Sequence, residues 1–247
     1  AVERVRQLVL DEVSAEASEL YSLDGYAAVR NACLLAGLLA DAEATVLIDD
    51  DEIFEGEDFL QRVKAGLSGS AGAGEEKAPV RLLAGYYYHR DGTYLLAPEL
   101  EHWTVRWRKS RRMNRLWKGL IEGEETLRKT PFALGGNLSV SRDVARAVPF
   151  DPRATRGEDG DYIMNCMLLG ETCWFDGKLG ILHDPPPKPH RRHVTLSQDF
   201  QRFLYGRAKL KASKDTFGVR ALSAEAFEPY PGPFVGEDLP SRIVQTA

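Results

Sequence analysis

The sequence predicts an α/β fold, with a mainly parallel mixed sheet flanked by helices. Two observations support this prediction. Amphipathic helical segments alternate with short apolar runs, as expected when helices connect the strands of one sheet. Four consecutive acidic residues, 49–52, directly follow the apolar run 45–48, so a buried strand is expected to end in a cluster of carboxylates. Open α/β sheets bind ligands at that end of their strands.

The individual elements follow from local patterns. Residues 2–20 place apolar side chains on one helical face, and residues 26–39 form a second, more apolar helix after a turn at 22–25. Further along, the patterns predict a helix at 54–67, a small-residue loop at 68–74, a strand at 80–88 that turns at 90–93 into a hairpin partner at 94–96, a helix leading through 162–169, and short strands at 173–175 and 179–182.

Composition bounds the classes of function. The 247 residues are 43% hydrophobic, enough for a substantial core, and the formal net charge is -5. That acidity provides no global positive field for nucleic acid or an anionic membrane. No apolar run approaches the roughly 18 residues of a membrane-spanning helix. Cys33, Cys166 and Cys173 show no metal-type spacing and are expected as buried free thiols. We therefore expect a cytoplasmic protein that binds no nucleic acid and has no integral membrane segment.

The acidic cluster Asp49, Asp50, Asp51 and Glu52 is the feature that most directly indicates chemistry. Carboxylates this close together repel one another unless a cation neutralises them. Mg2+ or Mn2+ is the natural candidate, because both take oxygen ligands and share them with substrate phosphates. The alternative is an ordinary solvated turn whose acidic residues cap the next helix.

A second acidic pair, Glu158 and Asp159, stands at the start of an expected helix. Simple capping would explain it, but a carboxylate here could also act as a general base toward an attacking hydroxyl. His183 ends a short apolar stretch. It is either a structural histidine or a nitrogen ligand to Mn2+ beside the carboxylates.

Two further segments have both structural and functional interpretations. Gly135, Gly136 and Asn137 precede a strand-like segment, where they either make a tight turn or let a sugar or acceptor approach the backbone. Residues 103–118 combine arginines and lysines with tryptophans, including Trp107. This segment suits nucleic acid, or a lid that binds the acceptor through stacking and charge, or a helix with a solvated basic face. The negative net charge of the whole chain favours the lid over nucleic-acid binding. The basic residues of this segment favour an acceptor that carries a negative group.

The order of these motifs resembles that of the family 2 glycosyltransferases with the A-type (GT-A) fold. The resemblance rests on four segments in sequence: 25–31 (GYAAVRN), 46–51 (VLIDDD), 135–142 (GGNLSVSR) and 157–162 (GEDGDY). It extends over about residues 25–185. It implies a glycosyltransferase domain at 1–190 of the nucleotide-diphospho-sugar transferase type, followed by a C-terminal extension at 191–247 that matches nothing in the family.

By this resemblance, Asp51 and Asp49 bind Mn2+ or Mg2+, with Asp49 near the ribose or the metal and Asp50 between them in the donor-binding motif. Arg30 lies near the diphosphate, and His183 is a further metal ligand. Asp159 is the base in inverting members, with Glu158 beside it. Gly135, Gly136 and Asn137 line the donor sugar or the acceptor side.

One segment of the family pattern is missing. Family members usually begin with a strand, a helix and a strand that build the pocket for the nucleotide base, whereas only 48 residues precede Asp49 here, and they predict two helices and one strand. Either the N-terminal part of the domain is absent from this chain or the base pocket is built differently. We favour the first, because a sheet without those strands would expose an apolar edge.

The sequence therefore predicts a metal-dependent glycosyltransferase of the hexosyltransferase type (EC 2.4), which transfers a sugar from a nucleoside-diphosphate sugar to a hydroxyl acceptor with inversion. Retention stays open, because retaining enzymes share the fold. A nucleotidyltransferase on a similar sheet is one alternative. A non-catalytic carbohydrate or nucleic-acid binding protein, using Trp107 and its neighbouring arginines, is the other.

Overall fold

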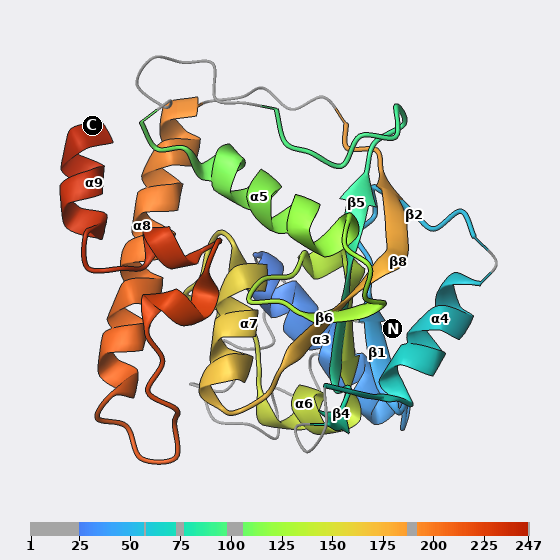
Figure 1. Ribbon diagram of the computed structural model, residues 1–247. Helices are drawn as coiled ribbons and strands as arrows, with labels where there is room; N and C mark the ends of the chain where they lie inside the picture. The colour runs from blue at the N-terminus through green and yellow to red at the C-terminus, as the bar shows by residue number, and fades with distance from the viewer. Residues whose placement is uncertain (1–24, 57, 73–76, 98–105, 187–191, 247) are drawn as a thin grey trace.

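A six-stranded mixed sheet forms the centre of the protein (Figure 1). The computed structural model describes residues 25–56, 58–72, 77–97, 106–186 and 192–246, and the helix expected at 2–20 lies outside them. The strand order is β1-β7-β5-β8-β2, with β6 also paired to β8. The strands are β1 (Ala44–Leu47), β2 (Glu52–Ile53), β5 (Leu82–Tyr88), β6 (Leu127–Lys129), β7 (Leu138–Ser141) and β8 (Cys173–His183); β3 (Ser70–Ala71) and β4 (Ala78–Pro79) form a separate two-stranded sheet.

The sheet is mixed, as expected, but the prediction that it is mainly parallel is wrong. Only β5 and β8 pair in parallel; the pairs β1–β7, β5–β7, β6–β8 and β2–β8 are antiparallel. Hydrophobic periodicity shows which residues form strands but carries no information on strand direction. Because β7 lies antiparallel between β1 and β5, the strands β1, β5 and β8 all run the same way. Their carboxyl ends therefore lie at one edge of the sheet.

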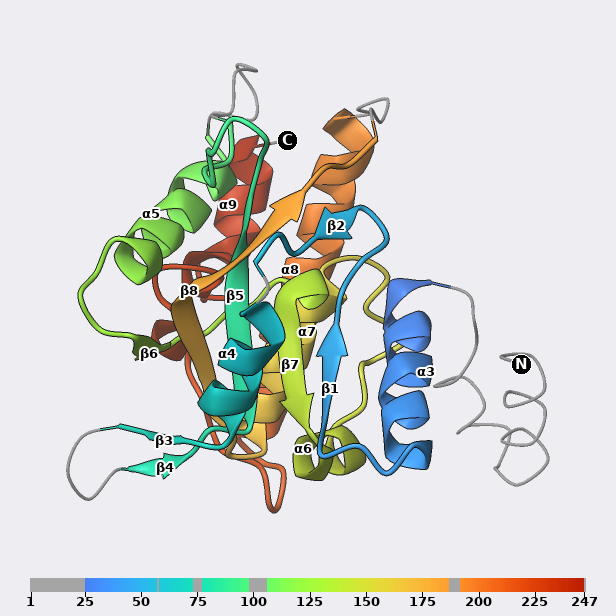
Figure 2. The same cartoon turned by 90° about the vertical axis from the view of Figure 1, so that its right-hand side faces the viewer.

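Helices cover both faces of this sheet (Figure 2). On one face α4 (Phe59–Leu67) packs Phe59 and Val63 against Leu83 of β5. The other face carries the larger core, which includes Leu82 of β5 and Met113 of α5. This alternation along β5 is the period-two pattern of a strand buried on both sides. The helices on the face with the larger core are α3 (Tyr26–Leu39), α5 (Lys109–Ile121), α6 (Arg142–Ala147), α7 (Glu158–Leu168), α8 (Arg192–Ser213) and α9 (Leu239–Thr246).

Several predicted elements have different bounds in the structure. The helix at 26–39 and the strand after it are confirmed. The helix expected at 54–67 begins only at Phe59, after the short strand β2 has paired with β8. The two short strands expected near 173 and 179 are one strand, β8. The hairpin partner expected at 94–96 is not a strand; the chain turns at His89, whose N–H donates to the carbonyl of Thr93, and Tyr94 then packs on Tyr86.

The segment after residue 190 packs onto the rest of the chain. Phe203 of α8, Tyr230 and Phe234 belong to the same buried cluster as Phe132 and the core residues of α7. In Figure 1 this segment lies beside α7, on the side away from α4. Two short 3-10 helices, η4 (Ala224–Phe227) and η5 (Gly232–Phe234), connect α8 to α9. The domain boundary at 190 stays a prediction. Across the described ranges, no helix combines the length and apolarity needed to span a bilayer.

Candidate active site

The candidate site lies where β1, β5 and β8 end. Asp49 follows β1, Tyr87 is near the end of β5, and His183 is the last residue of β8. The short strand β2 runs back along β8 and places Glu52 directly opposite His183. Residues distant in the sequence therefore meet at one edge of the sheet, where α/β proteins commonly bind ligands.

Arg30 connects two of the predicted motifs. Its Nη2 lies 3.0 and 3.1 Å from the two carboxylate oxygens of Asp49, and its Nε donates to Glu158 Oε1 at 3.2 Å. The Arg30 and Glu158 side chains are each 9% exposed, whereas Asp49 is 36% exposed. Burial alone would lower the pKa of Arg30, but the carboxylates of Asp49, Glu158 and Asp159 outweigh it and raise that pKa. The guanidinium is therefore a permanent positive charge between the two acidic motifs.

Gly135 and Gly136 create the space that this arrangement needs. They form the 3-10 turn η3 (Gly135–Asn137) directly before β7. A Cβ on Gly135 would lie 2.5 Å from Cζ of Arg30, and a Cβ on Gly136 would lie 2.1 Å from Oε1 of Glu52. Any larger residue would displace one of these two charged side chains. The glycines therefore make a tight turn and also allow groups to approach the backbone closely. The groups that approach are the side chains of Arg30 and Glu52.

Asp51, Glu52 and His183 form the group best suited to a metal ion. One ligand atom from each lies within 4.8 Å of the others, and His183 Nε2 is 3.7 Å from Asp51 Oδ2. The backbone supports the group, because the N–H of Asp184 donates to the carbonyl of Asp51 at 2.9 Å. Two carboxylates and an imidazole suit a divalent cation such as Mn2+.

Glu52 is the member of this group with unused binding capacity. It is 9% exposed, and its Oε1 is buried without a hydrogen-bond partner in the described structure. Its Oε2 accepts from the N–H of Asp49 at 2.7 Å. Burial raises the pKa of Glu52, against the nearby Tyr87 hydroxyl and the Asp49 N–H, which lower it. A buried carboxylate oxygen without a partner, beside an acid and an imidazole, fits a metal ligand.

Tyr87 contacts two parts of the site, the glycine turn and His183. Its hydroxyl accepts from the N–H of Gly136 at 2.9 Å, and its ring lies 4.7 Å from the ring of His183, centre to centre. Burial, and then the neighbouring Glu52, raise the pKa of Tyr87 well above its ordinary value, so the phenol stays protonated. It thus packs against the imidazole and hydrogen-bonds the glycine turn, which limits the orientations open to both.

Glu158 and Asp159 begin α7, whose amino end faces this edge of the sheet. Glu158 is buried, and its Oε1 accepts a hydrogen bond from Arg30. Burial and the charge of Asp159 raise the pKa of Glu158, while Arg30 lowers it. Asp159 is half-buried, and one of its oxygens accepts from the N–H of Gly160 at 2.6 Å. Of the two carboxylates, Asp159 is the more exposed, so it is the one that a ligand hydroxyl can reach more easily.

Three predicted site residues lie elsewhere. Asn137 is 1% exposed and donates to the carbonyls of Tyr86 and Leu179, so it joins β5 to β8. Trp107 is 2% exposed, and its ring is enclosed by aromatic rings of the C-terminal segment, Phe200, Phe203 and Phe234. An enclosed ring has no face open to a sugar, so we do not carry Trp107 into the proposed site. Asp50 is exposed in the turn after β1. Trp103, at the start of the basic segment 103–118, lies outside the described residues.

The sequence-based choice of ligands overlooked Glu52 and Tyr87. Glu52 is the fourth acid of the cluster, and its membership of that cluster is the only signal that could have pointed to it. Nothing in the local sequence distinguishes Tyr87 from its neighbours Tyr86 and Tyr88, because only the register of β5 decides which tyrosine faces the site.

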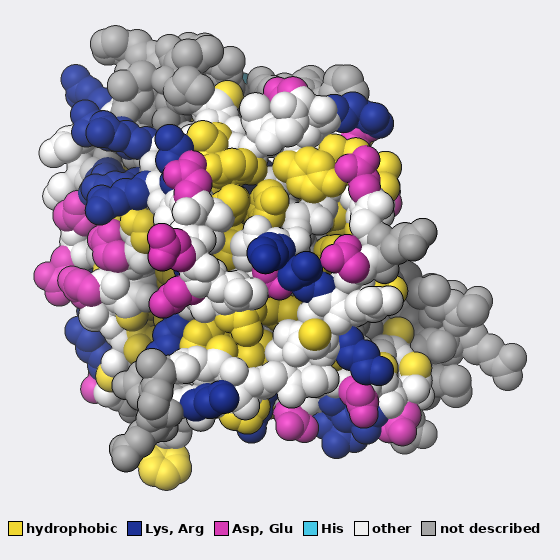
Figure 3. Space-filling view, turned by 45° about the vertical axis from the view of Figure 1, so that its right-hand side comes forward, with side chains coloured by type: hydrophobic (Ala, Val, Ile, Leu, Met, Phe, Trp, Pro, Cys, Tyr) yellow, Lys and Arg dark blue, Asp and Glu magenta, His cyan; other side chains and the backbone are white. Residues whose placement is uncertain are grey.

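The surface has no broad basic region on the face drawn in Figure 3, as far as the described residues show. Lysine and arginine side chains occur there in small groups, with acidic side chains between them. This mixture of charges agrees with the net charge of -5. Any anionic ligand must be held by local charges such as Arg30.

Comparison with known proteins finds similarity among solved structures. No protein-family model matches the chain, and a search of curated proteins gives no match. Among solved structures, the chain is similar to a mannosyltransferase from Pyrobaculum calidifontis in complex with GDP-Man and Mn2+, at 17% sequence identity and a TM-score of 0.47. The similarity covers 90% of this chain and 53% of the other, so this chain spans about half the length of that protein. A similarity at this level carries no argument about function, and the proposals below rest on the residues of this chain.

Proposed function

We propose that this chain carries the metal and base sites of a glycosyltransferase that moves a sugar from a nucleoside-diphosphate sugar to a hydroxyl acceptor. The observation that carries the proposal is Arg30, whose guanidinium binds Asp49 on one side and Glu158 on the other. These two contacts support the proposal that the acids after β1 and the acids at the start of α7 belong to one site. We further propose that the fold is of the GT-A type, that the enzyme is family 2-like and that it transfers a hexose (EC 2.4).

Asp51, Glu52 and His183 would hold the divalent ion, Mn2+ or Mg2+, with Asp49 at its edge. The imidazole favours Mn2+. When bound, such an ion neutralises charge on the departing diphosphate. Arg30 would add a second, fixed positive charge near the same phosphates, where charge-assisted hydrogen bonds are strongest.

Asp159 would be the general base. An acceptor hydroxyl attacks the anomeric carbon while its proton passes to the Asp159 carboxylate; the new carbon–oxygen bond forms as the bond to the diphosphate breaks, and the diphosphate leaves with the bonding electrons. Attack from the face opposite the leaving group gives inversion. Glu158 would act by holding Arg30 in position.

The test is donor chemistry with a matched control. We expect nucleoside-diphosphate sugars to raise the melting temperature only when Mn2+ or Mg2+ is present. Turnover should release a nucleoside diphosphate. Asp51→Asn should abolish both effects, whereas Asp143→Asn, at an exposed position of α6, should preserve both. Pyrophosphate release from a nucleoside triphosphate would instead identify a nucleotidyltransferase. Metal-independent ligand binding without turnover would identify a binding protein.

The stereochemistry is tested separately. NMR of the anomeric proton of the first-formed product should show inversion, and Asp159→Asn should then lower kcat by about 100-fold or more while leaving donor binding intact. A product of retained configuration would remove Asp159 from its proposed role.

A further inference from the structure

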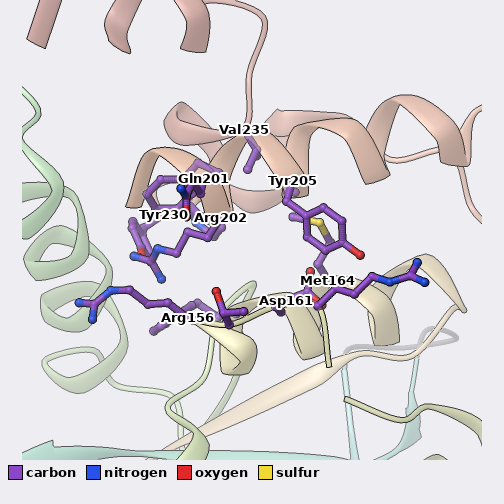
Figure 4. Close-up of a pocket in the computed structure, with 17 residues that line it drawn as sticks. Arg156, Asp161, Met164, Gln201, Arg202, Tyr205, Tyr230 and Val235 are labelled. Carbon is purple, nitrogen blue, oxygen red and sulfur yellow. The ribbon is translucent and has the colours of Figure 1, made fainter. Parts of the chain in front are cut away.

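A second site lies between α7 and the C-terminal segment. A cavity of about 370 Å3 is enclosed by the loop before α7, by α7 and α8, and by the segment around Tyr230 (Figure 4). Its volume falls within the range of about 300–1,000 Å3 that is typical of small-molecule sites. Gly157 and Gly160, which flank the Glu158–Asp159 pair, both line it. The cavity thus begins where the proposed base stands.

One end of the cavity is rich in positive charge. Figure 4 shows the guanidinium groups of Arg156 and Arg202 on the same side, opposite Tyr205. Both approach a single carboxylate, Asp199, which is 2% exposed; the separations are 3.7 Å from Arg156 Nε and 3.0 Å from Arg202 Nε. Lys109 of α5 also contacts Asp199, at 2.6 Å. Three cations therefore surround one buried carboxylate.

The hydrogen bonds at this end are incomplete. Within the described structure, Nε of Arg156 and Nε of Arg202 are buried and donate no well-aligned hydrogen bond, although both lie at ion-pair distance from Asp199 Oδ1. Burial lowers the pKa of Lys109, against the attraction of Asp199. Buried polar atoms without partners are rare in folded proteins, and those that do occur often mark places where a ligand or water completes the bonding. An anion placed between the two guanidinium groups would supply both acceptor atoms and negative charge.

The remaining acid in the cavity wall is already compensated. Lys209 Nζ lies 2.8 and 2.7 Å from the two carboxylate oxygens of Asp161. Asp161 also accepts from the side-chain amide of Asn165. It therefore does not offset the positive charge at the Arg156 end. The Arg156 end of the cavity therefore keeps its excess of positive charge.

The body of the cavity is aromatic and apolar. Phe132 and Tyr230 line it and meet edge to face, 5.0 Å between ring centres. Met164 and Val235 line it farther along α7 and η5. Such walls suit the carbon skeleton of a small molecule, whose orientation is then set by the few charged groups.

Asp159 connects the cavity to the proposed donor site. Asp159 lies between Glu158, which accepts a hydrogen bond from Arg30 on the metal side, and Gly160, which lines the cavity. Its place at the start of α7 therefore puts it next to both sites. A general base must stand within hydrogen-bond reach of the acceptor hydroxyl, and a position beside this cavity meets that need.

We propose that this cavity is the acceptor site, and that the acceptor is a small hydroxyl-bearing acid whose carboxylate or phosphate is bound by Arg156 and Arg202. The inference rests on the proposed function, because a hydroxyl presented here is an acceptor only if Asp159 is the base. The residues that select the acid are distinct from those that bind the metal and the diphosphate.

Binding of three related sugars tests the inference without donor or metal. Isothermal titration calorimetry should detect glucuronate, which tests a carboxylate, or glucose 6-phosphate, which tests a phosphate, but not glucose. Arg156→Gln should weaken the binding by about tenfold or more, because a hydrogen bond to a charged group is lost. Arg156→Lys should weaken it less. The matched control, Arg146→Gln, removes the same charge from an exposed position of α6 and should have no effect. Salt should weaken the binding.

The inference is overturned if neither acid binds, if glucose binds as tightly as the acids, or if Arg156→Gln binds them like the unmodified protein. The side chain of Arg156 is 40% exposed, so its replacement is expected to leave the fold intact, which circular dichroism would check. Failure of the proposed function has a different signature. In that case no nucleoside diphosphate is released with any acceptor, whatever the outcome of the calorimetry.

Discussion

Glu52 and His183 face each other across the antiparallel strands β2 and β8, and together with Asp51 their ligand atoms lie within 4.8 Å of one another. Pairing of the two strands therefore sets the spacing of the candidate metal ligands. Asp51 precedes β2 by one residue and is held to Asp184 by a backbone hydrogen bond. The site is thus anchored by the backbone on both sides before any metal binds.

Glu52→Gln should reduce Mn2+ affinity by about 10–100-fold, since it replaces a charged ligand by a neutral one of the same shape. Free Mn2+ can be measured by electron paramagnetic resonance during a titration. Asp143→Asn, on the exposed face of α6, is the charge-matched control and should bind like the parent. Parent-like affinity in Glu52→Gln, with loss in Asp49→Asn, would place the ion on Asp49 instead.

Two neighbouring glycines should have separable effects. Gly136→Ala would place a methyl group 2.1 Å from Glu52 Oε1 and should weaken metal binding, whereas Gly135→Ala would place one 2.5 Å from Arg30 Cζ and should weaken donor binding at saturating metal. Mn2+ titration and nucleotide-sugar titration would measure the two effects separately.

The control for this pair is Gly119→Ala in α5, where a Cβ meets nothing within 4 Å. Alanine is the better helix former by about 1 kcal/mol, so this variant should be as stable as the parent or more so. Equal effects of Gly135→Ala and Gly136→Ala on both titrations would contradict the assigned contacts.

Asn137→Ala should destabilise the fold by about 2–4 kcal/mol, because it leaves the carbonyls of Tyr86 and Leu179 buried and without their partner. Asn114 makes comparable bonds to the backbone of Leu96, at 2.8 Å each, but in an exposed setting. Water can replace the side chain there, so Asn114→Ala should cost less than about 1 kcal/mol. Urea denaturation compares the two. Similar costs would contradict a structural role for Asn137.

Asp151 should make stability depend on acidity. Burial would raise the pKa of Asp151, but hydrogen bonds from Lys209 and Tyr205 outweigh it and lower that pKa below 3.8. A lowered pKa in the folded state means that the stabilisation is complete above the unfolded value and is lost as pH falls through the folded one. Asp151→Asn should therefore cost about 1–3 kcal/mol at pH 7, and the difference from the parent should shrink below pH 3.8.

Denaturant unfolding between pH 7 and pH 3 measures this difference. Asp143→Asn, at an exposed position of α6, removes the same charge and should follow the parent at every pH. A constant gap between Asp151→Asn and the parent across this range would contradict the predicted dependence.

Local sequence patterns predicted those elements whose formation depends mainly on neighbouring residues. The helix at 26–39 and the strand before Asp49 depend on periodicity and on turn residues, and both are present. The Glu158 helix start was likewise predictable, because acidic residues favour the amino end of a helix. The order of the motifs also pointed to Arg30 and Asp49, whose contact the structure contains.

Other features depend on contacts that no local pattern contains. A tryptophan has an apolar ring and a polar N–H, so the sequence alone allows Trp107 either to face a ligand or to pack inside the protein. In the structure, Phe200 and Phe234 enclose its ring. The direction of β7 was not predictable, because an apolar run has the same pattern in either orientation.

By itself, the sequence determined the chemical inventory: four acids after a strand, an arginine on the preceding helix, two glycines before another strand and an acidic pair at a helix start. Only the tertiary structure decided which of these act together. Antiparallel pairing of β2 with β8 selected Glu52 as the partner of Asp51 and His183, and the packing of α8 on α7 created the cavity beside Asp159. Both results come from long-range packing, whose register and direction are set by the whole core and not by any short segment.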